Sequence, residues 1–193
     1  MASVVVLSNP FAAGNKSDLD RLRTFCAGRT DVIHIEVPNS DQTSDALTRV
    51  AAIRPQALVI NGGDGTVQTV LTALFRGGYL DAPLPALAVL PNGTTNIIAK
   101  DLGATGDPIR ALERVLKRVG DQQSQYRVTR ELIALTGGRE QGPPEIGMFL
   151  AGGALAETLI YCREKIYPLG LPNGVSHLPG RQVGAADVAD LAL

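Results

Sequence analysis

The sequence has 193 residues, of which 45% are hydrophobic and 19% are charged, and it contains no Trp. This composition is typical of a soluble globular protein and excludes a disordered or collagen-like chain. The net charge of -1 gives no bulk attraction to nucleic acid or to anionic lipid. We therefore expect no nucleic-acid partner, and any membrane contact has to come from a local patch.

The length is sufficient for one large domain, or for one complete domain and part of another. No segment approaches the roughly 20 apolar residues that span a bilayer, and the N-terminus resembles a first strand rather than a signal peptide. We expect a cytoplasmic protein, with peripheral contact at the inner membrane face left open. Cys26 and Cys162 lie far apart without metal-ligand spacing and are expected to be reduced thiols.

Four buried strands are expected in the first half of the chain. Each is a short apolar or β-branched run that stops at a turn signal. They are residues 4–7, 32–37, 57–60 and 86–90.

Helices are expected after these strands because apolar residues recur at three- and four-residue spacing. Ser17 is expected to cap the first helix, which ends at Gly28, and Thr43 or Ser44 the second. The third helix carries the apolar positions of 67–74. Asp107 caps and Pro108 opens another helix, which runs to residue 119.

This alternation predicts the α/β class, with a mostly parallel sheet and helices on both of its faces. Ligands of such sheets bind at the carboxyl ends of the strands. Three unusual loops fall there, at residues 9–16, 62–66 and 91–96.

After the helix that ends near residue 119, the sequence pattern changes from alternating strands and helices to consecutive strands. Residues 126–135 and 146–150, on either side of Gly137-Gly138, read as antiparallel strands. We therefore predict a nucleotide-binding domain over 1–121 and an incomplete β-rich domain with helical segments over 122–193. A helix is expected over 155–166, a loop over 168–180, and the apolar end suggests that part of the second domain is missing.

The strongest chemical signal is Gly62-Gly63-Asp64-Gly65-Thr66, between a buried strand and a helix. Glycines there allow positive φ angles and a close approach to phosphate, while amides at the helix start donate to the anion. Asp64 would repel phosphate unless a cation lies between them, which implies Mg²⁺ bound directly, through water or through phosphate. The alternative is a plain turn with Asp64 as a helix cap. Neither a Walker A loop nor a dinucleotide fingerprint is present.

The other two loops carry further polar groups. Thr94, Thr95 and Asn96 offer hydroxyls and an amide to phosphate or ribose oxygens. Lys16 can neutralise phosphate charge, or it is an ordinary surface lysine.

Together, the Asn9-Pro10…Gly14, Gly62–Thr66 and Pro91–Asn96 motifs resemble the diacylglycerol kinase catalytic-domain family, which includes sphingosine kinases and bacterial lipid kinases. The resemblance covers about the first 120 residues and continues weakly through 149–157. It implies an N-terminal domain like that of NAD kinases and diacylglycerol kinases, with ATP and Mg²⁺ as cofactors and a lipid hydroxyl as the phosphoryl acceptor.

The resemblance also implies roles for individual residues. Gly63, Asp64, Gly65 and Thr66 would hold the ATP phosphates, Thr94 would contact the nucleotide, and Asn9 would line the same pocket. A hydroxyl is expected before the second helix, and Ser40 and Thr43 are both candidates.

The chain departs from the family pattern in three places. Gln68 and Thr69 stand where Asn and Glu are common, and Ile97 stands where Asp is common. No D-G-E-like stretch supplies the general base, since Asp187 and Asp190 lie on a helix-like run. We therefore assign no catalytic residue.

Three other functions stay open. An NAD kinase shares the glycine-rich loop, although the 91–96 motif argues against it. A non-catalytic nucleotide-binding fragment or paralogue would explain the missing base. A flavodoxin-like binding domain explains the alternation but not the three loops together.

The remaining ionisable residues have ordinary explanations. His34 is expected to be structural, because it alternates with apolar neighbours on a strand. His177, near Lys165 and Tyr167, is either surface or close to a lipid headgroup. One helix carries a basic cluster that is either a solvated face or an anionic-membrane contact: Arg110, Arg114, Lys117 and Arg118.

Overall fold

A sheet of four parallel strands forms the centre of the fold, in the order β2-β1-β3-β4. The strands are β1 (Val4–Ser8), β2 (Val32–Glu36), β3 (Ala57–Gly62) and β4 (Ala86–Pro91). The inner strands β1 and β3 are buried along their whole length, which fits the apolar runs of residues 4–7 and 57–60. Both neighbours of β1 are in register with it, so that Val4 lies opposite Val32 and Ala57. The α/β class and the parallel sheet are confirmed.

The structure is a computed structural model that describes residues 3–79, 84–122, 124–137 and 142–150, with 152, 153, 157, 160, 161 and 164 beyond them. Met1–Leu150 and Ala151–Leu193 are separate compact units, and the sheet and the motif loops belong to the first. Six residues singled out from the sequence lie outside the described residues: Cys162, Lys165, Tyr167, His177, Asp187 and Asp190. So do the segment 168–180 and most of 155–166.

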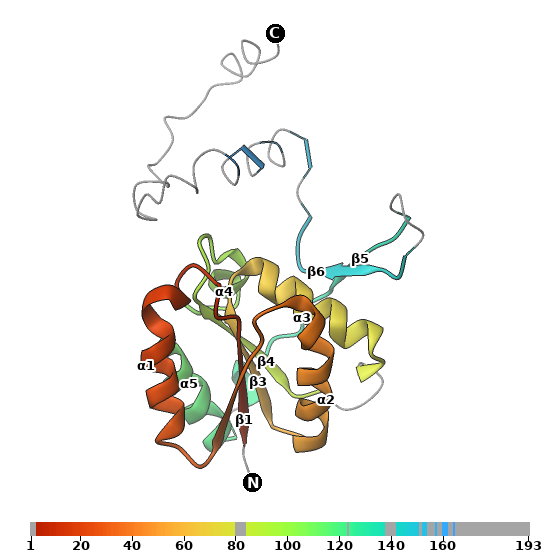
Figure 1. Cartoon of the computed structure of the whole chain (residues 1–193). Coiled ribbons are helices and arrows are strands. Elements are labelled where there is room, and N and C mark those ends of the chain that lie inside the picture. The colour runs from red at the N-terminus through yellow and green to blue at the C-terminus, as the bar shows by residue number, and fades with distance from the viewer. Residues whose placement is uncertain are drawn as a thin grey trace. The chain divides into compact units, whose positions relative to one another are not determined.

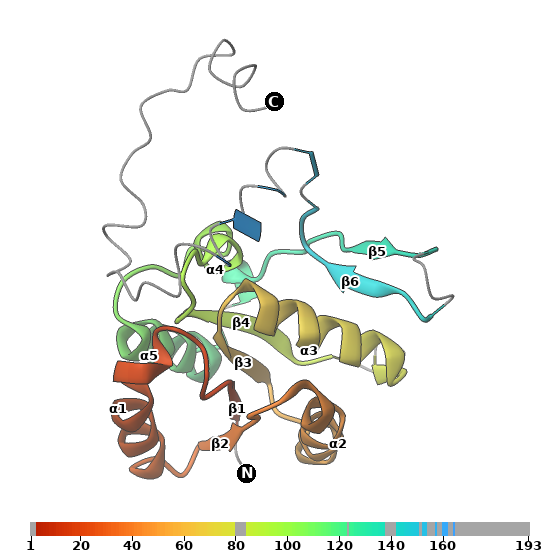
Figure 2. The ribbon, with the colours of Figure 1, turned by 45° about the horizontal axis from the view of Figure 1, so that its top comes forward.

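Helices cover both faces of the sheet (Figures 1 and 2). On one face, α1 (Asn15–Ala27) and α5 (Pro108–Gly120) bury Leu22 and Leu112 against the strands. On the other, α2 (Thr43–Ile53) and α3 (Asp64–Arg76) bury Leu47 and Val70. The short helix α4 (Ile97–Asp101) follows β4, and 3-10 turns cover Ser40–Gln42 and Ser124–Tyr126.

Two predicted helix caps are wrong. Helix α1 starts at Asn15 with Gly14 at the cap position, because Asn15 is drawn into the edge of the sheet; the Ser17 hydroxyl only donates to the Gly14 carbonyl. Helix α2 follows a 3-10 turn that Asn39 caps, so neither Thr43 nor Ser44 is the cap. The Asp107 cap of α5 is confirmed, since its carboxylate accepts from the Arg110 amide at 3.0 Å.

A short antiparallel ribbon follows α5 in the chain. It pairs β5 (Ile133–Leu135) with β6 (Glu145–Gly147), and both strands are shorter than the sequence predicts. The ribbon packs on α3, where the Ile146 amide donates to the Thr72 hydroxyl at 2.9 Å. It therefore belongs to the same compact unit as the sheet, and the domain boundary near Asp121 stays a prediction.

Cys26 is a free, buried thiol, and burial raises its pKa to about 11. Among the helices of the described ranges, none is long and apolar enough to cross a membrane.

Candidate functional site

The three motif loops meet at the carboxyl edge of the sheet and are bonded to one another through their backbones. The Asn9 amide donates to the Asn61 carbonyl at 3.0 Å, and the Gly14 amide donates to the Asn92 carbonyl at 3.0 Å. The edge of the sheet therefore holds the three loops as a single assembly.

Three buried asparagine side chains link the loops through hydrogen bonds. The Asn92 amide donates to the side-chain oxygens of Asn15 (2.6 Å) and Asn61 (2.8 Å). The Asn61 amide donates to Asn15 (2.9 Å) and to the Ser8 hydroxyl (2.8 Å). The Asn15 amide in turn donates to the Asn9 carbonyl at 2.6 Å. Because all three are buried, these hydrogen bonds replace water and stabilise one loop arrangement.

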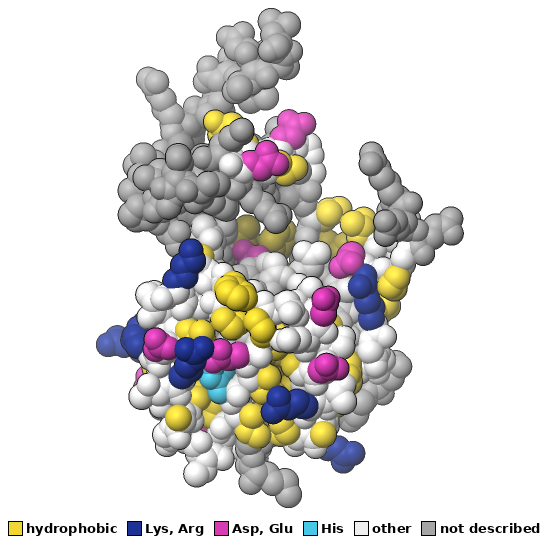
Figure 3. Space-filling view, in the orientation of Figure 1, with side chains coloured by type: hydrophobic (Ala, Val, Ile, Leu, Met, Phe, Trp, Pro, Cys, Tyr) yellow, Lys and Arg dark blue, Asp and Glu magenta, His cyan; other side chains and the backbone are white. Residues whose placement is uncertain are grey.

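This network is not predicted from the sequence. Its only sequence signal is a polar residue at the carboxyl end of three strands: Ser8 ends β1, Asn61 is the last but one residue of β3, and Asn92 follows β4. The network extends to β2, where Ser8 Oγ lies 2.7 Å from Nε2 of His34. Burial lowers the pKa of His34, which agrees with the structural role expected for it. On the face shown in Figure 3, histidine appears among acidic and basic side chains.

The glycines of the loops serve close approach rather than positive φ, contrary to the sequence-based expectation. None of Gly62, Gly63 and Gly65 has a positive φ. A Cβ at Gly62 would lie 2.6 Å from Oγ1 of Thr66, and a Cβ at Gly93 would clash with Cα of Gly63. Gly62 thus leaves room for the Thr66 side chain, while Gly63 and Gly93 let the 62–66 and 91–96 loops touch backbone to backbone.

Gly65 differs from these glycines. A Cβ at this position would meet no atom within 4 Å, and φ is not positive. Neither sterics nor backbone conformation requires glycine here. The space beside Gly65 is open at the first turn of α3, next to its amides.

Asp64 holds α4 in place. Its two carboxylate oxygens accept from the amides of Ile98 (2.9 Å) and Ile97 (3.1 Å) at the start of that helix. A carboxylate there is favourable because the first amides of a helix lack intrahelical acceptors. Asp64 therefore does cap a helix, as the alternative interpretation of the motif expects, but the helix is α4 and not α3, in which Asp64 lies. Helix α4 is not predicted from the sequence.

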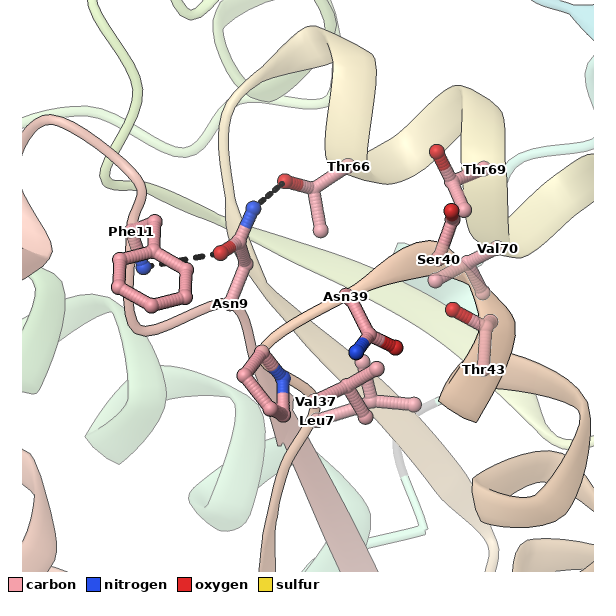
Figure 4. A pocket seen from close by; sticks show the side chains of 11 residues that line it. Leu7, Asn9, Phe11, Val37, Asn39, Ser40, Thr43, Thr66, Thr69 and Val70 are labelled. Carbon is pink, nitrogen blue, oxygen red and sulfur yellow. Dashed lines mark hydrogen bonds between the residues drawn. The ribbon is translucent and has the colours of Figure 1, made fainter.

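A pocket of about 170 Å³ opens beside these loops, between α2 and α3 (Figure 4). Asn9 and Thr66 form one wall, joined by a hydrogen bond of 3.1 Å from the Asn9 amide to the Thr66 hydroxyl. Ser40 and Thr43 both line the opposite wall, so the structure brings both candidate hydroxyls to the pocket. Phe11 lies at the rim with 73% of its surface exposed.

The other predicted residues lie outside the pocket lining. Lys16 is exposed in the first turn of α1 and makes no ion pair within the described ranges. The Asn96 side chain accepts from the Gly93 amide at 2.6 Å and donates to its carbonyl, so it shapes its own loop. Thr94 is half-buried and does not line the pocket.

A second groove, of about 380 Å³, lies along the outer side of β4, against α5 and residues 126–128. It includes the amino end of β4 and none of the motif residues. Two members of the basic cluster border it and are already engaged: Arg114 donates to the Thr105 carbonyl, and Arg118 stacks on Tyr126 at 4.3 Å. We therefore place the candidate site at the first pocket.

The donor set fits a nucleotide phosphate better than a bare metal ion. Among the described residues, no three His, Cys, Asp or Glu side chains gather as a metal site. Asp64 has spare lone pairs beyond its two amide bonds and can accept from a cation or its water shell. A Mg²⁺ ion here would need oxygens from a ligand, as MgATP provides.

Comparison with known proteins identifies a family over the part of the chain that holds these loops. The model of the diacylglycerol kinase catalytic domain matches residues 3–126. A protein of Streptococcus pneumoniae named "Putative lipid kinase" is 29% identical over 119 residues, which is 60% of this chain and 39% of that protein. The chain thus spans about two fifths of that relative.

Solved structures with a similar fold include two from Bacillus anthracis, described as "a putative diacylglycerol kinase" and as one of "diacylglycerol kinases". Their TM-scores are 0.49 and 0.48, both at 22% identity and covering 60% of this chain. The matches cover 40% and 42% of those two chains.

Proposed function

Because the chain belongs to the diacylglycerol kinase catalytic-domain family, we propose that it binds MgATP at the carboxyl edge of its sheet. In this proposal it supplies the nucleotide-binding half of an ATP-dependent lipid kinase. The observation that carries the proposal is the open space beside Gly65, next to a pocket lined by hydroxyl groups.

The phosphates would lie at the start of α3. The amides of Thr66 and Val67 already donate to the Gly63 carbonyl at 2.9 and 3.1 Å. The Asp64 and Gly65 amides have no acceptor among the described residues. They lie at the positive end of the dipole of α3, where an anion is favoured. Lys16 and Thr94 would add a charge and a hydroxyl from the neighbouring loops.

The rest of the nucleotide would occupy the pocket between α2 and α3. Thr66 and Asn9 offer polar contacts on one side, and Ser40 and Thr43 offer hydroxyls on the other. The exposed ring of Phe11 gives the rim an apolar surface that suits a nucleobase.

Asp64 would orient the metal-bound phosphates through Mg²⁺ or its water shell. MgATP, when bound, supplies the γ-phosphoryl group, and its transfer depends mainly on positioning and charge neutralisation. The residues of this chain would hold the phosphates, exclude water and keep the 62–66 and 91–96 loops together. The acceptor would be a lipid hydroxyl, reached by a cytoplasmic protein in peripheral contact with the inner membrane face.

A second candidate function is nucleotide binding without catalysis. No Asp, Glu or His is among the residues that line the described pocket, so no general base is seen there. This observation favours a binding role for the part of the chain that the structure describes. An NAD kinase function is less favoured, because the family model that matches is that of diacylglycerol kinases.

Calorimetric titration tests the proposal directly. MgATP is expected to bind saturably to the full 193-residue chain, and excess EDTA is expected to weaken binding by removing Mg²⁺. Parallel Ser40→Ala and Thr43→Val variants show which hydroxyl contacts the nucleotide. A folded chain that does not bind MgATP would contradict the proposal.

Transfer of labelled phosphate from ATP to diacylglycerol or to NAD then separates the candidate functions. Labelled lipid supports the kinase, whereas labelled NAD contradicts the choice of acceptor. Binding without transfer to either acceptor supports the non-catalytic alternative.

A further inference from the structure

The buried network beneath the loops has only one consistent direction of donation. The two amide hydrogens of Asn92 go to Asn15 and Asn61, and those of Asn61 go to Asn15 and Ser8. Those of Asn15 go to the carbonyls of Asn9 and Asn61. Every hydrogen of the three amides is therefore committed.

This direction fixes the role of the Ser8 hydroxyl. Its oxygen accepts from Asn61, so its own hydrogen is left to donate to the remaining neighbour, Nε2 of His34, at 2.7 Å. Nε2 must then be the unprotonated nitrogen, which places the ring hydrogen of neutral His34 on Nδ1.

We propose that Ser8 and His34 are positioning residues of the nucleotide site, and that a proton on Nε2 of His34 weakens nucleotide binding. The inference rests on the proposed function. Neither residue touches the nucleotide, and both act through Asn61 and the loops that it fastens.

Protonation conflicts with the rest of the network. A protonated Nε2 can only donate, so Ser8 Oγ would face two donors, Asn61 and His34. The Ser8 hydrogen would lose its acceptor, and Ser8 is fully buried, so water does not replace it. Because Ser8 Oγ has two lone pairs it can accept from both donors, so the cost is a buried hydroxyl hydrogen without an acceptor, and this cost weakens the bonds of Ser8 to Asn61 and His34.

Loss of the Asn61 link reaches the nucleotide site directly. Asn61 accepts from Asn92 and immediately precedes Gly62. The backbone carbonyl of Asn61 also accepts from the backbone amide of Asn9, and the side-chain amide of Asn9 holds Thr66 at the pocket wall. A change at Ser8 therefore loosens loops on both sides of the phosphate position.

Two charged side chains face His34. Glu36, on the same strand, favours its protonation, and Arg23, from α1, opposes it. These two form a bidentate ion pair at 2.6 and 2.7 Å, and Arg23 also bonds Asp20. Burial is the larger influence and lowers the pKa of His34, so the ring is neutral near physiological pH.

The first test determines the ring tautomer of His34 in the absence of nucleotide. Long-range proton–nitrogen NMR of the full chain, at a pH of about 7.5, is expected to show Nδ1–H and bare Nε2 for His34. The sequence contains only two histidines, and a His34→Gln variant assigns the signals. An Nε2–H tautomer would overturn the proposal.

The second test measures MgATP affinity between pH of about 7.5 and about 5.5 for the wild type and three variants. ATP itself titrates in this range, so variants are compared with one another at each pH. His34→Gln keeps an acceptor for Ser8 but cannot titrate. Its affinity is expected to exceed that of the wild type by about three- to tenfold where the same NMR measurement shows Nε2 of His34 protonated in the wild type.

His34→Phe and Ser8→Ala remove the acceptor and the hydroxyl, respectively. Both are expected to bind about three- to tenfold more weakly than the wild type at the higher pH, with His34→Gln restoring binding. Equal pH dependence in wild type and His34→Gln would overturn the proposal. If the wild type binds no MgATP at either pH, the proposed function fails, while the NMR tautomer still decides the network.

Discussion

Gly65 is the residue whose identity the folded chain does not explain by itself. Gly14, Gly63 and Gly93 are required because a Cβ would meet a neighbouring loop, and Gly62 because a Cβ would meet the Thr66 side chain. Gly65 instead has an ordinary φ and open space. Because the fold does not require glycine at this position, a substitution there tests the proposed phosphate position without disturbing folding.

Gly65→Ala is expected to leave the melting temperature unchanged or slightly higher, because Ala is favoured over Gly in a helix by about 1 kcal/mol. The same methyl group would occupy the phosphate position and weaken MgATP binding by more than about tenfold, about 1.4 kcal/mol. Calorimetry and thermal unfolding of the same sample measure both effects.

Two other glycines provide the controls. Gly120, the last residue of α5, also has open space, so Gly120→Ala is expected to affect neither property. Gly93→Ala should lower the melting temperature, because its Cβ would clash with Gly63. Unchanged nucleotide binding in Gly65→Ala would place the phosphates elsewhere.

Among the elements, α4 depends most on a partner distant in sequence. It has only five residues, too few to be stable alone. The carboxylate of Asp64 accepts its first amides and so ties α4 to the start of α3. One side chain thus sets the spacing of the 62–66 and 91–96 loops.

Asp64→Ala is accordingly expected to have two effects. Loss of the cap should lower the free energy of unfolding by about 1 kcal/mol, and loss of the carboxylate should weaken MgATP binding. Asp107→Ala is the matched control, because Asp107 caps α5 on the opposite side of the sheet from the pocket. It should lower stability without changing MgATP affinity, as denaturant titration and calorimetry would show. Equal loss of affinity in both variants would mean that Asp64 acts only through stability.

At the scale of the whole molecule, ion pairs and caps make stability depend on pH. A bond to Arg23 lowers the pKa of Glu36, one to Arg29 lowers that of Asp31, and the Arg110 amide lowers that of Asp107. Each carboxylate stabilises the folded state at pH above its ordinary pKa. The stabilisation is lost as the pH falls through the lowered, folded-state pKa.

His34 also makes the folded state less stable at low pH, but through burial and not through an ion pair. Its lowered pKa favours the neutral ring in the folded chain, so stability falls as the pH drops below the ordinary histidine value of 6.5. Urea midpoints measured against pH should decline in two stages, first for His34 and then for the carboxylates. His34→Gln should remove the first stage alone, and a first stage that persists in this variant would assign it to another group.

Much of this protein follows from local sequence. The apolar runs of β1 and β3 and the Asp107-Pro108 start of α5 are local signals, and the structure confirms them. The three loops at the sheet edge also follow from the sequence, because parallel strands place their carboxyl ends together. The family resemblance rests on these loops, and the matching domain model confirms it.

Tertiary structure alone decided how the loops are joined. The hydrogen bonds between Asn15, Asn61 and Asn92 span 31 to 77 residues, and that between Asp64 and Ile98 spans 34. Local propensity does not pair such groups, because their contact exists only after the sheet has brought the strand ends together. The same packing moved the start of α1 to Asn15, since burying its amide in the network outweighed a Ser17 cap.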